Sequence, residues 1–322
     1  MNILGIETSC DETGASVVKD GRTILSNVVA SSLKHHKRYG GIIPEIASRK
    51  QLEFIHSVTG QAVASAGLAP SGLHAIAVTA SPGLIGSLLV GTSFAGAMGF
   101  ALNLPVIEVD HIKAHLYASF LRRPDDQRAR LPGLPAVGLI VSGGHSSLYY
   151  MKSFTDFQLL GQTRDDAAGE AFDKVARILE LGYPGGPVID RLAGSGIKNN
   201  TLRFTASRLE GSFDFSFSGT KTAVLYHHQA NRKNPDYSVA KTVDAFQNSV
   251  VSVLTEKTIQ ACLKKKAKTL VVGGGVAANS ALRRSLTSAA SENGINIFFP
   301  SMDLCMDNAA MVAGYAYHLK QG

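Results

Sequence analysis

The sequence contains no tryptophan and only three cysteines, Cys10, Cys262 and Cys305. These cysteines lie far apart, so they form neither a CxxC metal-binding pair nor the framework of a disulfide-stabilised domain. The first residues carry no basic segment and include an acid at position 7, which argues against a signal peptide. Together these absences predict a protein of a reducing compartment, the cytoplasm.

Charged residues are also sparse, at 18% of the chain, whereas hydrophobic residues make up 45%. This composition excludes a disordered chain and a coiled coil. A length of 322 residues predicts two domains at about 100–200 residues each. The 32 basic residues exceed the 25 acidic ones by 7, which is compatible with a nucleic-acid partner but does not require one.

One long stretch, residues 75–107, has no charged residue and could by length span a bilayer. Pro82 and Gly83 interrupt it after a strand-like segment, and Pro105 precedes a second one. This pattern indicates strand, glycine turn, buried helix and strand of an α/β domain. We therefore expect no membrane partner.

The predicted elements form two similar series. In the first, they are strands 2–8, 14–19 and 23–30, helix 44–66, strand 75–79, helix 84–102 and strand 105–109. In the second, they are strands 136–141, 146–151 and 157–162, helix 169–180, a less regular stretch 183–236, helix 239–265, strand 269–272, helix 279–292, strand 296–299 and a helix from about 307.

Each series begins with a three-stranded antiparallel meander, which predicts an α/β protein of two similar lobes facing a cleft. We place the first lobe at 1–108 and the second at 109–306, with a last helix, 307–322, that packs back on the first lobe. Open α/β sheets bind ligands at the carboxyl ends of their strands, so the cleft is the expected site.

His111 and His115 directly follow strand 105–109. If a helix starts there, a spacing of four puts both imidazoles on one face, where they can bind one metal ion. Zinc proteases carry a catalytic glutamate at the position that Ile112 occupies here. The pattern predicts a metal pair without a proteolytic base, and two polar residues without a metal are the alternative.

Two glycine-rich segments, Ser142-Gly143-Gly144 and 273–275, each follow a buried strand. A backbone without side chains can approach an anion there, and the start of a helix adds partial positive charge. Taken together the two segments favour a nucleotide cradle, whereas either alone is also typical of a simple tight turn.

Three further charged patterns have ordinary structural explanations beside functional ones. Asp166, Glu170 and Asp173 fall on one helix face, which is usually solvated. Asp307 stands near the start of the last helix, where it is a normal N-cap and gains a second role only if that helix points at the histidines. Lys34, Lys37 and Arg38 lie in a predicted loop and are candidates for contact with the phosphates of a nucleic acid.

Seven segments of the sequence occur together and in order, and through them the whole chain resembles one family. They are Gly5–Thr13, His111–His115, Ser142–His145, Asp165–Lys174, Tyr183–Pro187, Gly273–Asn279 and Asp307-Asn308. The chain resembles the bacterial TsaD (YgjD/Gcp) family of tRNA N6-adenosine threonylcarbamoyltransferases. The resemblance implies the two-lobed fold of actin, sugar kinases and heat-shock chaperone ATPases.

The resemblance also implies a reaction, in which threonylcarbamoyl-adenylate donates its threonylcarbamoyl group to N6 of the adenosine adjacent to the anticodon. The acceptors are tRNAs that read codons starting with A, and AMP is released. One divalent metal is implied, iron or alternatively zinc, and an adenine nucleotide occupies the donor site. A TsaB-like paralogue and a TsaE-like ATPase are the implied partners, besides tRNA.

Site residues carry over by position. His111, His115 and Asp307 correspond to metal ligands, and the substrate contacts are Ile140, Val141, Ser142, Gly143, Gly144, Asp173, Gly186, Asp190 and Asn279. Asp11 and Glu12 are our own candidates for orienting the metal or the attacking amine, with loop structure as the alternative. A metal-dependent peptidase and a small-molecule kinase of the same fold are the competing functions.

Overall fold

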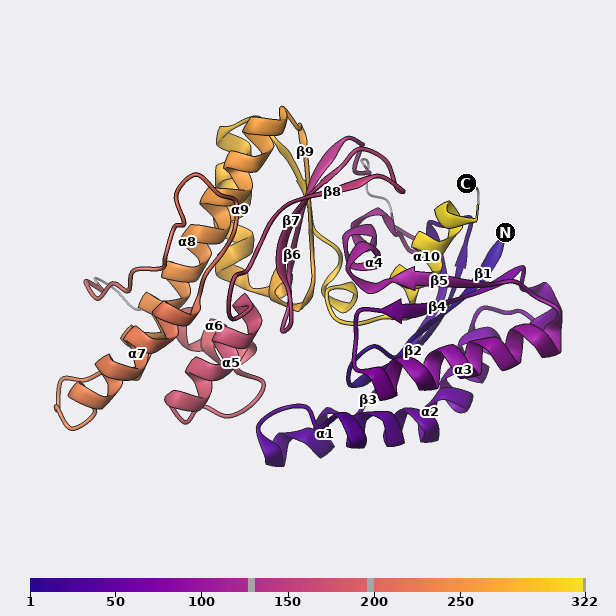
Figure 1. Ribbon diagram of the computed structural model, residues 1–322, viewed down its shortest axis with the longest axis horizontal. Coiled ribbons are helices and arrows are strands. Elements are labelled where there is room, and N and C mark those ends of the chain that lie inside the picture. The colour runs from indigo at the N-terminus through magenta and orange to yellow at the C-terminus, as the bar shows by residue number, and fades with distance from the viewer. Residues whose placement is uncertain (127–130, 196–199, 321–322) are drawn as a thin grey trace. The chain divides into compact units, whose positions relative to one another are not determined.

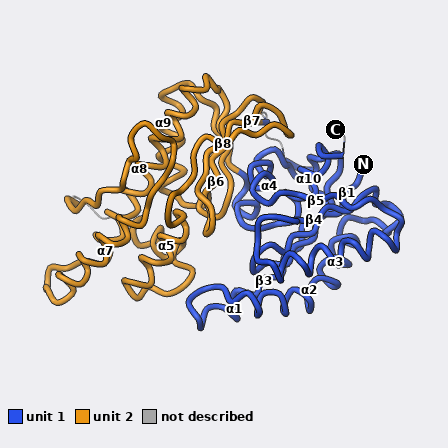
Figure 2. Tube along the Cα trace, viewed as in Figure 1, with its two compact units in different colours: residues 1–131, 300–322 blue, residues 132–299 orange. Residues whose placement is uncertain are grey.

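The computed structural model describes residues 1–126, 131–195 and 200–320 (Figure 1). Figure 2 shows two compact units, the first formed by Met1–Leu131 with Pro300–Gly322 and the second by Pro132–Phe299. We call them unit 1 and unit 2. This division differs from the expected lobes, because residues 109–131 stay with the first sheet: the helix that follows its last strand packs against that sheet and against the last helix of the chain.

Unit 1 is built on a five-stranded sheet in the order β3-β2-β1-β4-β5. Its strands are β1 (Asn2–Glu7), β2 (Glu12–Lys19), β3 (Thr23–Ser31), β4 (Ala75–Ser81) and β5 (Val106–Asp110). The first three form the predicted antiparallel meander, whereas β4 and β5 run parallel to β1. Asp20 and Gly21 join β2 to β3 with φ values of 51° and 70°, as a tight hairpin turn requires.

Helices cover both faces of this sheet (Figure 1). The helices of unit 1 are α1 (Leu33–His36), α2 (Pro44–Ser65), α3 (Ile85–Leu102), α4 (His111–Tyr117) and α10 (Ala309–Leu319), with 3-10 turns at Lys37–Tyr39, Pro70–Gly72, Ala118–Phe120 and Met302–Leu304. Side chains alternate along β1, so Leu4 and Ile6 join the core under α2 and α3. Gly5 faces α10, and a Cβ there would lie 2.3 Å from the carbonyl oxygen of Ala309. Only glycine lets α10 approach so closely.

Unit 2 repeats the arrangement with the sheet order β10-β9-β6-β7-β8. Its strands are β6 (Ala136–Val141), β7 (Ser146–Met151), β8 (Phe157–Gln162), β9 (Thr269–Gly273) and β10 (Asn296–Phe298). Its helices are α5 (Ala168–Ile178), α6 (Gly185–Ala193), α7 (Ser218–Asn231), α8 (Val239–Lys265) and α9 (Ser280–Glu292), with a 3-10 turn at Gly275–Ala278. Both sheets therefore place a meander beside two parallel strands, which confirms the predicted duplication.

Two sequence predictions about local structure were wrong. The stretch 183–236 contains two helices, α6 and α7, where we expected irregular structure. Residues 34–38 lie in the helical turn of α1 and the 3-10 turn after it, where we expected a loop. Buried His36 holds this segment together, because it contacts the Ser32 hydroxyl and accepts a hydrogen bond from the Ile43 backbone N–H.

Helix α3 is the one helix in the described part of the chain whose length and mean hydropathy would allow it to cross a membrane. In unit 1 it packs against β4 and α2, and the Thr8 hydroxyl donates to the Ser87 carbonyl at 2.8 Å. Gly91 lies so close to Thr8 that a Cβ would be 2.3 Å from its Oγ1. The helix is thus a structural part of the sheet domain. We expected it to be buried, but its outer face is exposed, with Ile85 and Phe100 at 89% and 92%.

Candidate functional site

The two histidines lie side by side because a helix starts where β5 ends. Asp110 caps α4 by accepting the Lys113 backbone N–H at 2.9 Å, so His111 and His115 occupy one helix face, one turn apart. Their exposed fractions are only 8% and 1%. The sequence prediction of a helical histidine pair is confirmed.

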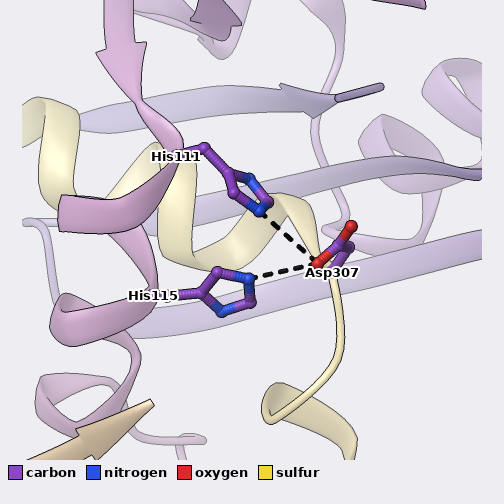
Figure 3. Close-up of side chains that lie close together, drawn as sticks. All are labelled: His111, His115 and Asp307. Atoms are coloured by element: carbon purple, nitrogen blue, oxygen red, sulfur yellow. Dashed lines mark hydrogen bonds and ion pairs between the residues drawn. The ribbon is translucent and has the colours of Figure 1, made fainter. Parts of the chain in front are cut away.

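Asp307 reaches the same place from the other end of the chain (Figure 3). Asn308, and not Asp307, caps α10 by accepting the Met311 backbone N–H. The Asp307 carboxylate instead points at the histidines, with Oδ1 3.1 Å from Nε2 of His115 and 3.6 Å from Nε2 of His111. The helix therefore meets the condition that we set for a second role of Asp307.

The charges of neighbouring side chains shift the pKa values of both histidines. Burial lowers the pKa of His111, but the carboxylates of Glu7 and Asp307 outweigh it and raise that pKa to about 9. Burial, together with the charge of His111, lowers the pKa of His115. Without a metal, the cluster thus has one protonated and one neutral imidazole beside a carboxylate.

The donor set fits a divalent metal. One ligand atom from each of His111, His115 and Asp307 lies within 4.8 Å of the others. Donor atoms that bind one ion at about 2.1 Å lie roughly 3–3.5 Å apart. The two distances from Asp307 Oδ1 to the histidine Nε2 atoms, 3.1 and 3.6 Å, are close to this range. Two imidazoles and one carboxylate suit iron or zinc and leave coordination positions for other ligands.

The two acidic candidates lie where the chain passes from β1 to β2, with Asp11 in the turn and Glu12 as the first residue of β2. Glu12 Oε1 accepts the Ser31 hydroxyl at 3.0 Å, whereas the buried Oε2 has no partner in the described part of the chain. Burial and the charge of Asp11 raise the pKa of Glu12 to about 7. Burial and the charge of Asp307 also raise the pKa of Asp11.

Sequence reasoning missed one residue that supports this turn, Gln51 of α2. Its fully buried side-chain amide donates to the carbonyl oxygens of Thr8, Cys10 and Glu12, at 3.1, 3.0 and 3.1 Å. Gln51 therefore fixes the path of the chain past both acids. A polar residue at a buried position of a helix is the only signal for it, and no sequence pattern shows which turn it contacts.

In unit 2, the turn after β6 is built around Ser142. Its backbone N–H donates to the His145 carbonyl and its hydroxyl accepts the His145 N–H. A Cβ on Gly143 or Gly144 would meet nothing within 4 Å, and neither residue has a left-handed φ. Packing and backbone conformation therefore do not explain these two glycines, whereas a ligand that approaches the backbone would.

The second glycine loop, residues 273–275, packs against the end of β6 just before this turn. Gly274 has a φ of 90°, and a Cβ on it would lie 2.4 Å from the Val141 carbonyl oxygen. Gly169, at the start of α5, is equally close to the Ser142 carbonyl, with a Cβ at 2.6 Å. The segment 273–275 and the start of α5 thus pack against the end of β6, so the two predicted loops belong to one structure.

The remaining candidates position the starts of helices. Asp173 accepts the Gly185 backbone N–H at 2.7 Å, where α6 begins, and Gly186 beside it is open. Asp190 accepts both the backbone N–H and the hydroxyl of Ser280, the first residue of α9.

Asn279 has contacts at both ends of its side-chain amide. It caps α9 by accepting the Leu282 N–H, and its amide group donates to Gln247 Oε1 at 2.7 Å. With Asp190 on the neighbouring Ser280, the start of α9 is held by two candidate residues.

The ordinary explanation of the acidic pattern at α5, a solvated face, holds for neither Asp166 nor Asp173. Asp166 precedes α5 and forms ion pairs with Lys174 and Lys221 at 2.6 and 2.9 Å. Asp173 is only partly exposed, and burial raises its pKa although it accepts a backbone N–H. Asp166 thus stabilises the folded unit through its two ion pairs, whereas burial of Asp173 disfavours the charged form of its carboxyl group.

Two sheets with the same strand order, each a meander beside parallel strands, define the fold class of actin, sugar kinases and heat-shock chaperone ATPases. A solved relative in fold is HypF of T. kodakarensis, with a TM-score of 0.65 and 14% sequence identity over 99% of this chain and 48% of HypF. Identity this low shows the fold alone.

Sequence comparison defines the family. The family model "TsaD: tRNA N6-adenosine threonylcarbamoyltransferase" matches residues 23–314. Proteins named tRNA N6-adenosine threonylcarbamoyltransferase from Moorella thermoacetica and Fusobacterium nucleatum are 49% and 47% identical to this chain. The alignments cover 98% and 99% of this chain and 91% of each relative. The chain belongs to the TsaD family of tRNA N6-adenosine threonylcarbamoyltransferases.

Proposed function

We propose that this protein transfers the threonylcarbamoyl group of threonylcarbamoyl-adenylate to N6 of the adenosine adjacent to the anticodon, and releases AMP. The acceptors are tRNAs that read codons starting with A. The observation that carries the proposal is the convergence of His111, His115 and Asp307 in a chain that matches this family over most of its length.

Unit 2 is assigned to the adenylate. The end of β6, with Ile140, Val141 and Ser142, and the open glycines Gly143 and Gly144 offer bare backbone to the nucleotide. Partial positive charge at the starts of nearby helices favours a phosphate. No covalent intermediate is needed, because a mixed anhydride of a carbamate and AMP is already activated.

Four further residues of unit 2 are proposed to contact the donor or to shape its site. Asp173 accepts the backbone N–H groups of Gly185 and Gly186 and so fixes the backbone there, which leaves the open surface of Gly186 to face the ligand. Asp190 and Asn279 already hold the start of α9. For these two we favour a shaping role, in which they orient the backbone that the donor meets.

Unit 1 is assigned to the acyl end of the donor. His111, His115 and Asp307 would hold one divalent metal, which we propose to be iron, with zinc as the alternative. Such an ion, when bound, supplies a Lewis acid for a carbonyl oxygen. The protein would hold the ion at a fixed position, because both histidines are buried and lie on a capped helix.

Glu12 is the candidate that accepts a proton from the attacking amine. Its unpartnered Oε2 and a pKa near 7 suit a group that takes up a proton at neutral pH. Asp11 next to it keeps that pKa raised and is proposed to orient the amine.

Lys34, Lys37 and Arg38 are proposed to contact tRNA phosphates. All three are exposed on α1 and the turn after it, and the Arg38 guanidinium lies 4.7 Å from the ring centre of half-exposed Tyr39. Basic side chains beside an exposed aromatic ring can contact both phosphates and bases of RNA.

Partner proteins are proposed as well, a TsaB-like paralogue and a TsaE-like ATPase. Helix α3 exposes Ile85, Leu89 and Phe100, which a paralogue partner would remove from water. We place the protein in the cytoplasm, where tRNA and the adenylate are available.

The competing functions are not favoured. A peptidase needs a general base beside the histidines, and the corresponding residue, Ile112, is apolar and buried. A small-molecule kinase shares the fold, but the family and its named relatives are transferases.

The test supplies the purified protein and its two partners with threonylcarbamoyl-adenylate and tRNA. AMP release and N6-threonylcarbamoyladenosine, measured by mass spectrometry, should rise in equal amounts. A tRNA that reads codons starting with another base is the matched control and should stay unmodified. AMP without modified nucleoside would overturn the proposed acceptor, and no AMP at all would overturn the transferase.

A further inference from the structure

One buried carboxylate beside the metal cluster has no role in the function proposed above. Glu7, the last residue of β1, is completely buried, with an exposed fraction of 0%. A charge in such a place is costly unless every lone pair has a partner. The hydrogen-bond partners of Glu7 therefore indicate why a carboxylate is buried at this position.

Glu7 accepts hydrogen bonds from two sides of the fold. Oε1 accepts the Ser9 backbone N–H at 2.6 Å, and Oε2 accepts the Thr79 hydroxyl of β4 at 2.7 Å. These two contacts hold the carboxylate between the ends of adjacent parallel strands. Its orientation is thereby fixed without any contribution from α4.

The third contact of Glu7 is to a metal-ligand candidate. Oε2 lies 3.0 Å from Nδ1 of His111, and the Ser9 hydroxyl lies 3.2 Å from the same nitrogen. The other ring nitrogen, Nε2, faces Oδ1 of Asp307 (Figure 3). A carboxylate at Nδ1 requires a hydrogen there, so the lone pair of a neutral His111 is left at Nε2, on the side of Asp307.

We propose that Glu7 is a positioning residue for the metal, and that it fixes the ring orientation and the Nδ1–H tautomer of His111. It also adds a second negative charge next to a cation that Asp307 alone would only half neutralise. The inference rests on one part of the proposed function, that His111, His115 and Asp307 hold a divalent metal. Glu7 itself does not bind the metal.

The test measures affinity for zinc on the full-length protein, by competition with a chelator of known affinity, and needs no activity. Loss of a carboxylate that orients a ligating histidine costs about 10–100-fold in metal affinity. We expect a loss in this range for Glu7→Gln. The matched control is Glu45→Gln, the same change at an exposed residue of α2 that pairs with Arg49, and it should bind zinc like the wild type.

A second readout reports on the tautomer. In the zinc-loaded wild type, nitrogen-15 NMR should show His111 with a hydrogen on Nδ1, and its proton should resonate far downfield because it is bonded to a carboxylate. In Glu7→Gln this proton should move upfield. A purely structural role of Glu7 would leave the resonance in place.

Thr79→Val provides an independent arm if Glu7→Gln does not fold. It removes the hydrogen bond to Oε2 while Glu7 stays, and should weaken zinc binding by a smaller factor, about two- to five-fold. If the wild type binds zinc and both folded variants bind it equally well, the inference is wrong and the proposed function stands. If the wild type binds no zinc, iron or cobalt, the metal-binding part of the proposed function fails with it.

Discussion

Glu12→Gln should make the protein more stable and less active, and the gain in stability should depend on pH. Burial and Asp11 raise the pKa of Glu12 from 4.5 to about 7. Between these two values the folded protein binds more protons than the unfolded chain, so the free energy of unfolding falls as pH rises. At 1.36 kcal/mol per pKa unit, the charged form of Glu12 costs about 3 kcal/mol above pH 7.

Glutamine has the same shape and does not titrate, so the variant should avoid this cost. The free energy of unfolding of chelator-treated protein, from urea titrations at pH 5, 6, 7 and 8, should be similar for both proteins at pH 5. At pH 8 the variant should be more stable by about 3 kcal/mol. Transfer activity should fall by about 100-fold or more, as when a general base is removed.

Glu45→Gln is the control for this experiment, because the exposed Glu45 pairs with Arg49 on the surface of α2. Its stability difference from the wild type should stay flat across the same pH range. If the free energies of unfolding of wild type and Glu12→Gln change with pH in the same way, the pKa of Glu12 is not raised in the folded protein, and the reasoning is refuted. If stability behaves as expected but activity is unchanged, Glu12 does not accept the proton.

Three further outcomes are expected. Asp307→Asn should abolish tight metal binding, measured by elemental analysis, while circular dichroism shows an unchanged fold; full occupancy would contradict the ligand assignment. Gly5→Ala should lower the free energy of unfolding by about 3 kcal/mol or more, because its Cβ would lie 2.3 Å from a carbonyl oxygen of α10. In the same urea titrations Gly60→Ala, on an open face of α2, should raise it slightly. Charge reversal of Lys37 and Arg38 should weaken tRNA binding and flatten its salt dependence in filter-binding assays, and an unchanged salt slope would exclude phosphate contact there.

Much of the fold could be predicted because its strands and long helices carry clear periodic patterns. Strands β6, β7 and β8 and helix α8 have the predicted bounds, since alternating or helical apolar positions end at turn residues. Helices α6 and α7 were missed. The first begins with Gly-Gly-Pro, which breaks a helix everywhere except in its first turn.

The candidate site was predictable only in part. The spacing of four residues identified His111 and His115 as a pair. Asp307 lies 192 residues from His115, and only the resemblance to the family placed it with the histidines. Glu7 was missed because a buried acid at the end of a strand has the same sequence signature as an exposed one. Its partners, Ser9, Thr79 and His111, come together only when three strand ends meet in the folded sheet.

Unit 1 is assembled from both ends of the chain, whereas unit 2 is one continuous segment inserted between them (Figure 2). During synthesis on the ribosome, residues 132–299 are therefore available to fold before the C-terminal segment exists. Helix α10 and Asp307 are synthesised after this segment, so they can join the first sheet only then. The histidine–aspartate cluster therefore joins two histidines that are synthesised before unit 2 with an aspartate that is synthesised after it.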